Sequence, residues 1–198
     1  MKVSLICPTN ALGGSATKSI YYPMGILLVG SLLKDTFPSW DVEAIDGELY
    51  SQEELEQKVK HADVLGLSAN TNNYPFCVEL AVFAKSQGVK RVILGGPHAT
   101  ALPRQILKNQ PSIDEVIVHD GEESFLEVLA GRDLPTIPNV YWRNTKGNIQ
   151  QNKIILPTKP PRIVDMDFSL MALEPYWKQH QEEFPEMDER FIEGFTHV

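Results

Sequence analysis

The sequence predicts an α/β domain built on a doubly wound parallel sheet of five strands, followed by a β-hairpin and a C-terminal extension. The chain has 198 residues, enough for one ordinary core, and 42% of them are hydrophobic against 22% charged. Short apolar runs alternate with longer segments of helical period, which is the pattern of successive βα units. Strands are expected over Val3–Cys7, Asp41–Ile45, Val64–Ser68, Arg91–Leu94 and Glu115–Val118.

Helices are expected after each of these strands, and local signals support their ends. Pro23 and Pro75 fit a first helical turn, where a missing amide proton costs little. Ser51 followed by Glu54 has the capping-box pattern, and Gly88 lies where a left-handed residue would end a helix. The predicted helices are Pro23–Lys34, Gln52–Lys60, Pro75–Ser86, Leu102–Lys108 and Glu122–Ala130.

The character of the chain changes after residue 131. Asn139–Arg143 and residues 149–155 flank a turn-like segment, so we expect a hairpin that extends the sheet edge or packs on it. Residues 156–167 are rich in proline and predict an extended connector. We therefore assign one domain to residues 1–143, and to residues 144–198 the completion of the hairpin, a linker and the start of a further domain.

Charge and cysteine content exclude several classes of protein. A net charge of −8 provides no overall field to attract nucleic acid. Cys7 and Cys77 lack the spacing of a disulfide scaffold or a zinc site, and no stretch approaches the roughly 18 apolar residues of a membrane span. We expect a cytoplasmic protein with free thiols, and neither nucleic acid nor membrane as a partner.

The loops after the strands are the candidate binding segments, because open parallel sheets bind ligands beyond the carboxyl ends of their strands. Residues 8–22 form a long loop, and long loops at this edge commonly bind a ligand. Small and amide residues follow the third strand, and paired glycines follow the fourth, where a flat ligand or a phosphate could approach the backbone. The same residues also suit ordinary helix caps and bends, so both interpretations remain open.

Common catalytic motifs are absent from the 198 residues. There is no Walker loop, no GxGxxG after the first strand, no GxSxG elbow and no cluster with metal-ligand spacing. Glu122 and Glu123 are adjacent and point in different directions on a helix, so they make a poor acid–base pair. The sequence therefore assigns neither catalytic nor metal-binding residues.

Five segments, taken in order, resemble the cobalamin-binding domain of radical S-adenosylmethionine enzymes. They are Tyr22–Ile26, Ala44–Asp46, Asp63–Ser68, Leu94–Thr100 and Gly121–Phe125. The resemblance covers roughly residues 1–143, and the later segment 163–167 resembles the linker that leads to the radical domain. It implies a Rossmann-like, flavodoxin-like fold with cobalamin over the carboxyl edge and its nucleotide tail beside Ser68 and the Gly95–Gly96 turn. The implied binding residues are Asn10, Gly13, Tyr22, Gly25, Ser68, Asn70, Gly95, Gly96, Pro97, His98, Gly121 and Glu122.

The segment before the first helix differs from cobalamin domains of the methionine synthase type. Those domains use a DxHxxG motif, in which the histidine binds cobalt from the lower face. With Gly25 as the motif's glycine, Ile20 stands in the place of the aspartate and Tyr22 in the place of the histidine. A phenol is protonated at neutral pH and is a poor ligand. The resemblance therefore implies cobalamin held in the base-off form without a histidine lower ligand.

The family resemblance implies a binding module of a larger enzyme, a methyltransferase or a related one. The CxxxCxxC motif that would hold a [4Fe-4S] cluster is absent here, so cluster and S-adenosylmethionine are expected in a radical domain elsewhere in the parent protein. The expected partners are cobalamin and that radical domain. Two alternatives remain: a corrinoid-free scaffold or substrate-recognition domain of the same family, and a flavin- or nucleotide-binding domain that uses the loop over residues 9–17.

Overall fold

Within the described residues, the apolar runs pair into a seven-stranded sheet of order β2-β1-β3-β4-β5-β6-β7. The computed structural model describes residues 1–8, 22–156 and 165–183. The first five strands are parallel, and β6 and β7 add antiparallel at the β5 edge. The parallel order is that of a flavodoxin-like doubly wound sheet, so the predicted fold class is confirmed. The strands are β1 Lys2–Cys7, β2 Asp41–Asp46, β3 Val64–Ser68, β4 Arg91–Gly95, β5 Glu115–Ile117, β6 Val140–Arg143 and β7 Ile149–Gln151.

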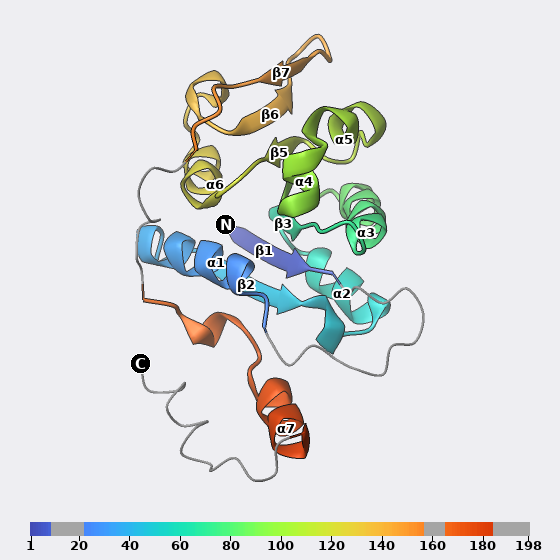
Figure 1. Ribbon diagram of the computed structural model, residues 1–198, viewed down its shortest axis with the longest axis vertical. Helices are drawn as coiled ribbons and strands as arrows, with labels where there is room; N and C mark the ends of the chain where they lie inside the picture. Colours follow the sequence, from blue (N-terminus) through green and yellow to red (C-terminus); the bar gives the residue numbers. More distant parts are fainter. Residues whose placement is uncertain (9–21, 157–164, 184–198) are drawn as a thin grey trace.

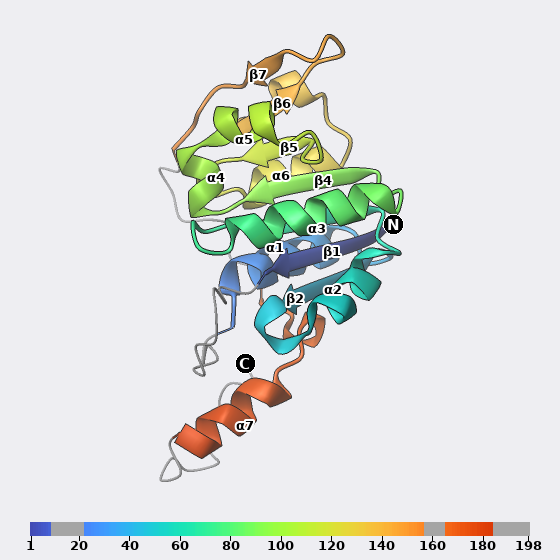
Figure 2. The same ribbon diagram turned by 90° about the vertical axis from the view of Figure 1, so that its right-hand side faces the viewer.

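Helices cover both faces of the sheet. Helices α1 and α6 lie on one face, and α2, α3 and α5 lie on the other (Figure 1). The parallel strands point the same way, with α4 at their carboxyl end (Figure 2). The α-helices are α1 Met24–Thr36, α2 Gln52–Val59, α3 Tyr74–Ser86, α4 Pro97–Ala101, α5 Pro103–Asn109, α6 Glu122–Leu129 and α7 Glu174–Glu183. Short 3-10 helices are η1 Gly47–Leu49, η2 Leu134–Thr136 and η3 Phe168–Leu170.

The sheet divides the hydrophobic core into two halves, because successive side chains of a strand point to opposite faces. Leu5 packs in the half below α1 and α6, whereas its neighbour Ile6 packs in the half below α2 and α3. Fully burying a side chain of this size contributes about 1.5–3 kcal/mol. The two halves together hold the strands firmly, and with them the carboxyl edge from which the loops begin.

The predicted boundaries of the five parallel strands and of their helices agree with the structure to within two residues. The capping box of Ser51 and Glu54 is present. Helix α4 was not predicted as a separate element, and the second hairpin strand already ends at Gln151. Beyond Gln151, Ile155 is held by a side chain instead of a neighbouring strand: its N–H donates to Asn139 Oδ1, and its C=O accepts from Asn139 Nδ2. The hairpin extends the sheet edge, which was one of the two expected arrangements.

The C-terminal extension, residues 165–183, returns to the domain and packs on α1 and β2. Leu170 is buried, and its Cδ1 lies 3.1 Å from the point where a Cβ on Gly30 would sit. The backbone N–H of Asp167 donates to Ser31 Oγ over 2.9 Å. No pattern in the sequence predicted this return, and the boundary after residue 143 stays a prediction.

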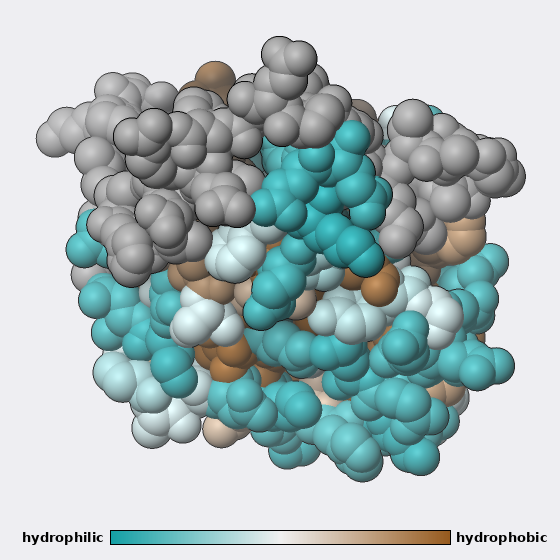
Figure 3. All heavy atoms as spheres, turned by 90° about the horizontal axis from the view of Figure 1, so that it is seen from below, coloured by the Kyte–Doolittle hydropathy of each residue, from teal (hydrophilic) through white to brown (hydrophobic). Residues whose placement is uncertain are grey.

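Among the described residues visible from the α7 end, the surface is mostly hydrophilic, with small hydrophobic patches between polar side chains (Figure 3). In the described segments, no helix combines the length and the apolar character needed to cross a membrane. Cys7 and Cys77 are free thiols, as expected. The cytoplasmic address and the lack of a nucleic-acid partner stay predictions.

Candidate functional site

A pocket opens at the carboxyl edge of the sheet, on the face that carries α1 and α6. Its volume is about 170 Å³. Side chains of β1, β5, α1 and α6 form its walls, and the ends of β3 and β4 contribute backbone and small residues. The lining residues are Leu5, Gly25, Ile26, Val29, Gly66, Leu67, Ser68, Gly95, Gly96, Ile117, His119, Gly121, Glu122 and Phe125.

The Gly95–Gly96 turn joins the ends of β3 and β4. Gly96 has φ +93°, and a Cβ there would lie 2.7 Å from the carbonyl oxygen of Ala69 and 2.8 Å from its nitrogen. Ala69 is itself fixed, because its N–H donates to Gly95 O and its oxygen accepts from the His98 N–H, both at 2.9 Å. Close approach between two backbones therefore requires glycine at position 96 whether or not a ligand binds. A Cβ on Gly95 would find its nearest neighbour 3.9 Å away.

Two further glycines keep the pocket narrow and lined by apolar side chains. A Cβ on Gly66 would lie 2.7 Å from Leu5 Cδ2 and 2.9 Å from Phe125 Cζ. A Cβ on Gly121 would lie 2.7 Å from Ile117 Cγ2. The missing side chains let Leu5 and Phe125 approach β3 and let the start of α6 approach β5, so the pocket is a narrow slot.

Asn73 ties the ends of β1 and β3 together. Its side chain is fully buried: Oδ1 accepts from the Asn70 N–H at 2.7 Å, and Nδ2 donates to Pro8 O at 3.1 Å and Ser68 O at 3.2 Å. The Asn70 side chain caps the same turn by accepting from the backbone N–H groups of Asn72 and Asn73. These bonds are the local capping role of amide side chains, one of the two interpretations left open by the sequence.

His98 lies outside the pocket lining. Its ring stacks on Tyr74 with centroids 4.1 Å apart, and its Nδ1 lies 3.3 Å from Thr71 Oγ1. Burial lowers the pKa of the imidazole, which favours the neutral ring. The preceding Pro97 occupies the first turn of α4. Both residues shape the β4–α4 turn from the α3 side of the sheet.

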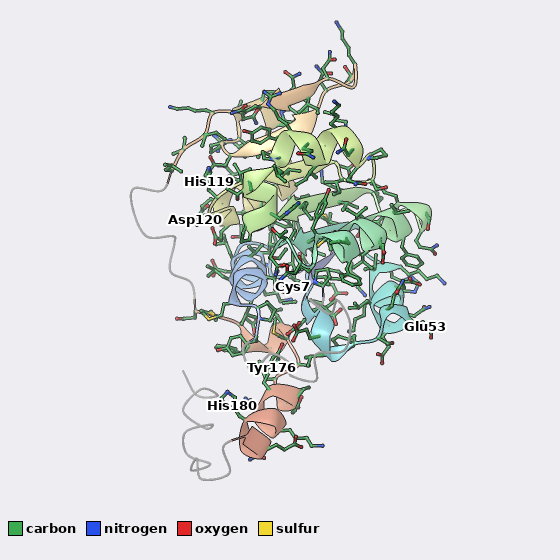
Figure 4. The ribbon with its side chains drawn as sticks, turned by 45° about the vertical axis from the view of Figure 1, so that its right-hand side comes forward. Cys7, Glu53, His119, Asp120, Tyr176 and His180 are labelled. Atoms are coloured by element: carbon green, nitrogen blue, oxygen red, sulfur yellow. The ribbon has the colours of Figure 1, made fainter. Side chains whose placement is uncertain are left out.

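The mouth of the pocket carries its polar side chains. His119 is exposed and has φ +62°, and its backbone N–H donates to Thr100 Oγ1 at 2.9 Å. Figure 4 shows His119 and Asp120 close together on the α1 and α6 side of the sheet. Glu122 begins α6, and Ser68 ends β3. Polar groups thus surround the opening of a slot whose walls are apolar.

A second cluster links the C-terminal extension to the start of α1. The Tyr22 ring lies edge-on to Phe168 and Tyr176, with centroids 5.8 and 5.9 Å away. The Tyr176 hydroxyl donates to the buried carboxylate of Asp46, whose pKa is raised by burial. Burial, and then the charge of Asp46, raise the pKa of Cys7 to about 12. The Cys7 thiol therefore stays protonated and is a poor nucleophile or metal ligand; Figure 4 shows Cys7 and Tyr176.

The pocket brings together half of the twelve residues singled out by the sequence. Those in its lining are Gly25, Ser68, Gly95, Gly96, Gly121 and Glu122. Tyr22, Asn70, Pro97 and His98 lie at the same edge without lining the pocket. Asn10 and Gly13 lie outside the described residues. A role in binding stays a prediction for all twelve.

The apolar walls of the pocket were not anticipated. Leu5, Phe125 and their neighbours look like ordinary core residues in the sequence, because only the fold brings two strands and two helices around one slot. Gly66 did carry a signal, since a glycine inside a strand often marks a close approach. Among residues 1–8, 22–156 and 165–183, no group of three His, Cys, Asp or Glu side chains could hold a metal ion.

A doubly wound sheet with an apolar slot at its carboxyl edge defines a domain that holds a small molecule beside its strand ends. Comparison with family models identifies the family of this domain: the B12 binding domain model matches residues 12–129. The chain belongs to the B12 binding domain family, which confirms the resemblance found in the sequence and supports cobalamin as the cofactor.

The curated relatives are longer proteins than this chain. The chain is 26% identical over 179 residues to an anaerobic magnesium-protoporphyrin IX monomethyl ester cyclase of Synechocystis, covering 84% of the chain and 34% of the relative. It is 29% identical over 156 residues to an uncharacterized methyltransferase of Pyrococcus horikoshii, covering 72% of the chain and 33% of the relative. The chain thus spans about a third of the length of these relatives.

Solved structures with the same fold include two radical S-adenosylmethionine enzymes. The methyltransferase TsrM of Kitasatospora setae, with cobalamin and a [4Fe-4S] cluster bound, matches with a TM-score of 0.61 at 14% identity over 83% of this chain and 31% of that one. The cobalamin-dependent enzyme OxsB, with aqua-cobalamin bound, matches with a TM-score of 0.61 at 17% identity over 79% and 22%. The protein is therefore a B12-binding domain that resembles those of cobalamin-dependent radical S-adenosylmethionine enzymes.

Proposed function

We propose that this domain holds cobalamin in the base-off form at the carboxyl edge of its sheet and presents it to a radical S-adenosylmethionine domain of the same parent protein. The parent reaction would be a methyl transfer or a related reaction. The observation that carries the proposal is the slot between α1 and α6, whose lining contains six residues implied by the family resemblance. The size of the relatives supports a further domain, since the chain spans about a third of them.

The residues of the pocket fit a corrinoid with an extended nucleotide tail. The flat base of the tail would enter the slot between Ile26 and Phe125, where apolar walls exclude water. The mouth near Ser68 and Gly95 would take the polar ribose and phosphate. The corrin ring would then lie over the strand ends, and bound cobalamin would supply a cobalt atom able to carry a methyl group.

The residue at the position of the histidine ligand supports binding without such a ligand. Tyr22 packs edge-on against Phe168 and Tyr176, so its ring is engaged in the contact between α1 and the extension. His119 lines the pocket mouth and is the histidine to test. We expect His119→Ala to leave the visible spectrum of bound hydroxocobalamin unchanged, with His98→Ala as the matched control. A spectrum altered by His119→Ala alone would show that this histidine ligates the cobalt.

The binding step is tested by mixing the purified chain with hydroxocobalamin and, separately, with methylcobalamin, followed by desalting and visible spectroscopy. Retained corrinoid, with the methylcobalamin band moved to the shorter wavelengths of a base-off form, would support the proposal. A folded chain that retains no corrinoid would favour a scaffold or substrate-recognition domain instead. A flavin absorbance in the purified chain would favour the flavin-binding alternative.

A further inference from the structure

We infer that the pocket selects the base of the corrinoid's nucleotide tail, admitting a benzimidazole and discriminating against a purine; the inference rests on the proposed function. The first observation is the gradient of burial along the lining. The interior side chains of Leu5, Ile117 and Phe125 are at most 7% exposed and purely hydrocarbon. The polar lining residues Ser68, His119 and Glu122 lie at the mouth, and each is at least partly open to solvent.

The second observation concerns unsatisfied polar atoms. In the described part of the chain, two buried side-chain atoms lack a hydrogen-bond partner, Ser4 Oγ and Glu115 Oε2. Neither residue lines the pocket. The buried side chains of the slot, Leu5, Ile117 and Phe125, carry no donor or acceptor, and Gly66 lets Leu5 and Phe125 approach β3.

These walls treat the two classes of base differently. Both classes attach to the ribose through a ring nitrogen, so the six-membered ring is the edge that enters the slot first. In 5,6-dimethylbenzimidazole that edge carries C–H and methyl groups, which gain from burial. In adenine it carries ring nitrogens and an amine, which would lose their bonds to water without finding partners. One such loss weakens binding by about five- to 150-fold.

Val29 is the position from which the preference can be altered. It lies on α1, lines the pocket and is half-buried, so a modest polar side chain there reaches the slot without entering the centre of the core. Val29→Asn places an amide, with both a donor and an acceptor, among the apolar walls. The matched control is Val82→Asn, the same change on an exposed position of α3, where Val82 is 53% exposed and does not line the pocket.

The test measures the affinity of the chain for three corrinoids: cobalamin, its adeninyl counterpart, and cobinamide, which has no nucleotide base. We expect cobalamin to bind at least tenfold more tightly than the adeninyl form. We expect Val29→Asn to reduce that ratio at least threefold and Val82→Asn to leave it unchanged. Equal affinities of the unaltered chain for cobalamin and the adeninyl form would overturn the inference while leaving the proposed function standing. A folded chain that binds none of the three would overturn the proposed function itself.

Discussion

The turn at Gly96 provides the sharpest quantitative test of the local geometry. At φ +93° and ψ −179° its backbone lies in a region that is essentially restricted to glycine, and a side chain there costs about 1–3 kcal/mol. The Cβ of Gly96→Ala would also lie within 2.8 Å of two backbone atoms of Ala69, which hydrogen bonds hold on both sides. The two effects together predict a loss of about 3 kcal/mol in the free energy of unfolding. For a domain of this size the midpoint of thermal unfolding falls by about 6–12 °C.

The assay is thermal unfolding followed by circular dichroism, with two glycine-to-alanine controls. Gly95 is the adjacent residue, but a Cβ there would have its nearest neighbour 3.9 Å away, so we expect Gly95→Ala to change the unfolding midpoint little. Gly88 has φ +85°, but a Cβ there would meet open space. Gly88→Ala therefore measures the cost of backbone strain without a steric clash, which we expect to be about 1 kcal/mol. A Gly96→Ala protein that unfolds within 1 °C of the parent, or no earlier than Gly95→Ala, would refute this account of the turn.

Three further substitutions test other contacts. Burial raises the pKa of Glu115 to about 7 from 4.5, so the native carboxyl holds its proton more strongly than the unfolded one, and stability falls as the pH rises through that window. This fall is at most about 3 kcal/mol between pH 4.5 and 8, measured as the free energy of unfolding in urea, and Glu115→Gln should remove it. A Glu115→Gln protein with the same pH dependence as the parent would contradict the prediction. Tyr176→Phe removes the hydroxyl that donates to the buried Asp46 carboxylate. We expect the free energy of unfolding to fall by about 2 kcal/mol and proteolysis within residues 165–183 to become faster. An unchanged rate of cleavage would argue against this contact as the one that holds the extension on the domain. Asn73→Ala leaves the Asn70 N–H and the carbonyl oxygens of Pro8 and Ser68 without their side-chain partner. In the same urea assay the free energy of unfolding should fall by about 2 kcal/mol. A loss below about 0.5 kcal/mol would count against the role of Asn73 in joining β1 and β3.

Strands and helices could be predicted because each carries its own local signal. Val64–Ser68 is a short run dominated by Val and Leu and was placed without error, and the capping box of Ser51 and Glu54 fixed the start of α2. The extension over residues 165–183 carried no such signal. Its docking depends on Leu170 meeting a gap above Gly30, a contact between residues far apart in the chain.

The candidate site was predictable in position but only partly in composition. Strand ends locate the edge of an open sheet, so Ser68 and Gly95 could be chosen from the sequence. The hydrocarbon walls could not, because Leu5 and Phe125 are indistinguishable from core residues until β1 and α6 are brought together. Conversely, Asn70 was chosen for its amide, which the structure uses to cap a turn.

The most direct measurement of cobalamin binding by this domain is its thermal unfolding midpoint at increasing concentrations of hydroxocobalamin. A ligand that binds only the folded state at a free concentration a hundred times its dissociation constant adds about 2.7 kcal/mol of stability. For a chain of this length, that gain corresponds to a midpoint raised by about 5–10 °C. We predict such a concentration-dependent rise. A midpoint that stays constant across all concentrations, in a chain with a cooperative unfolding transition, would contradict the assignment of cobalamin to this domain.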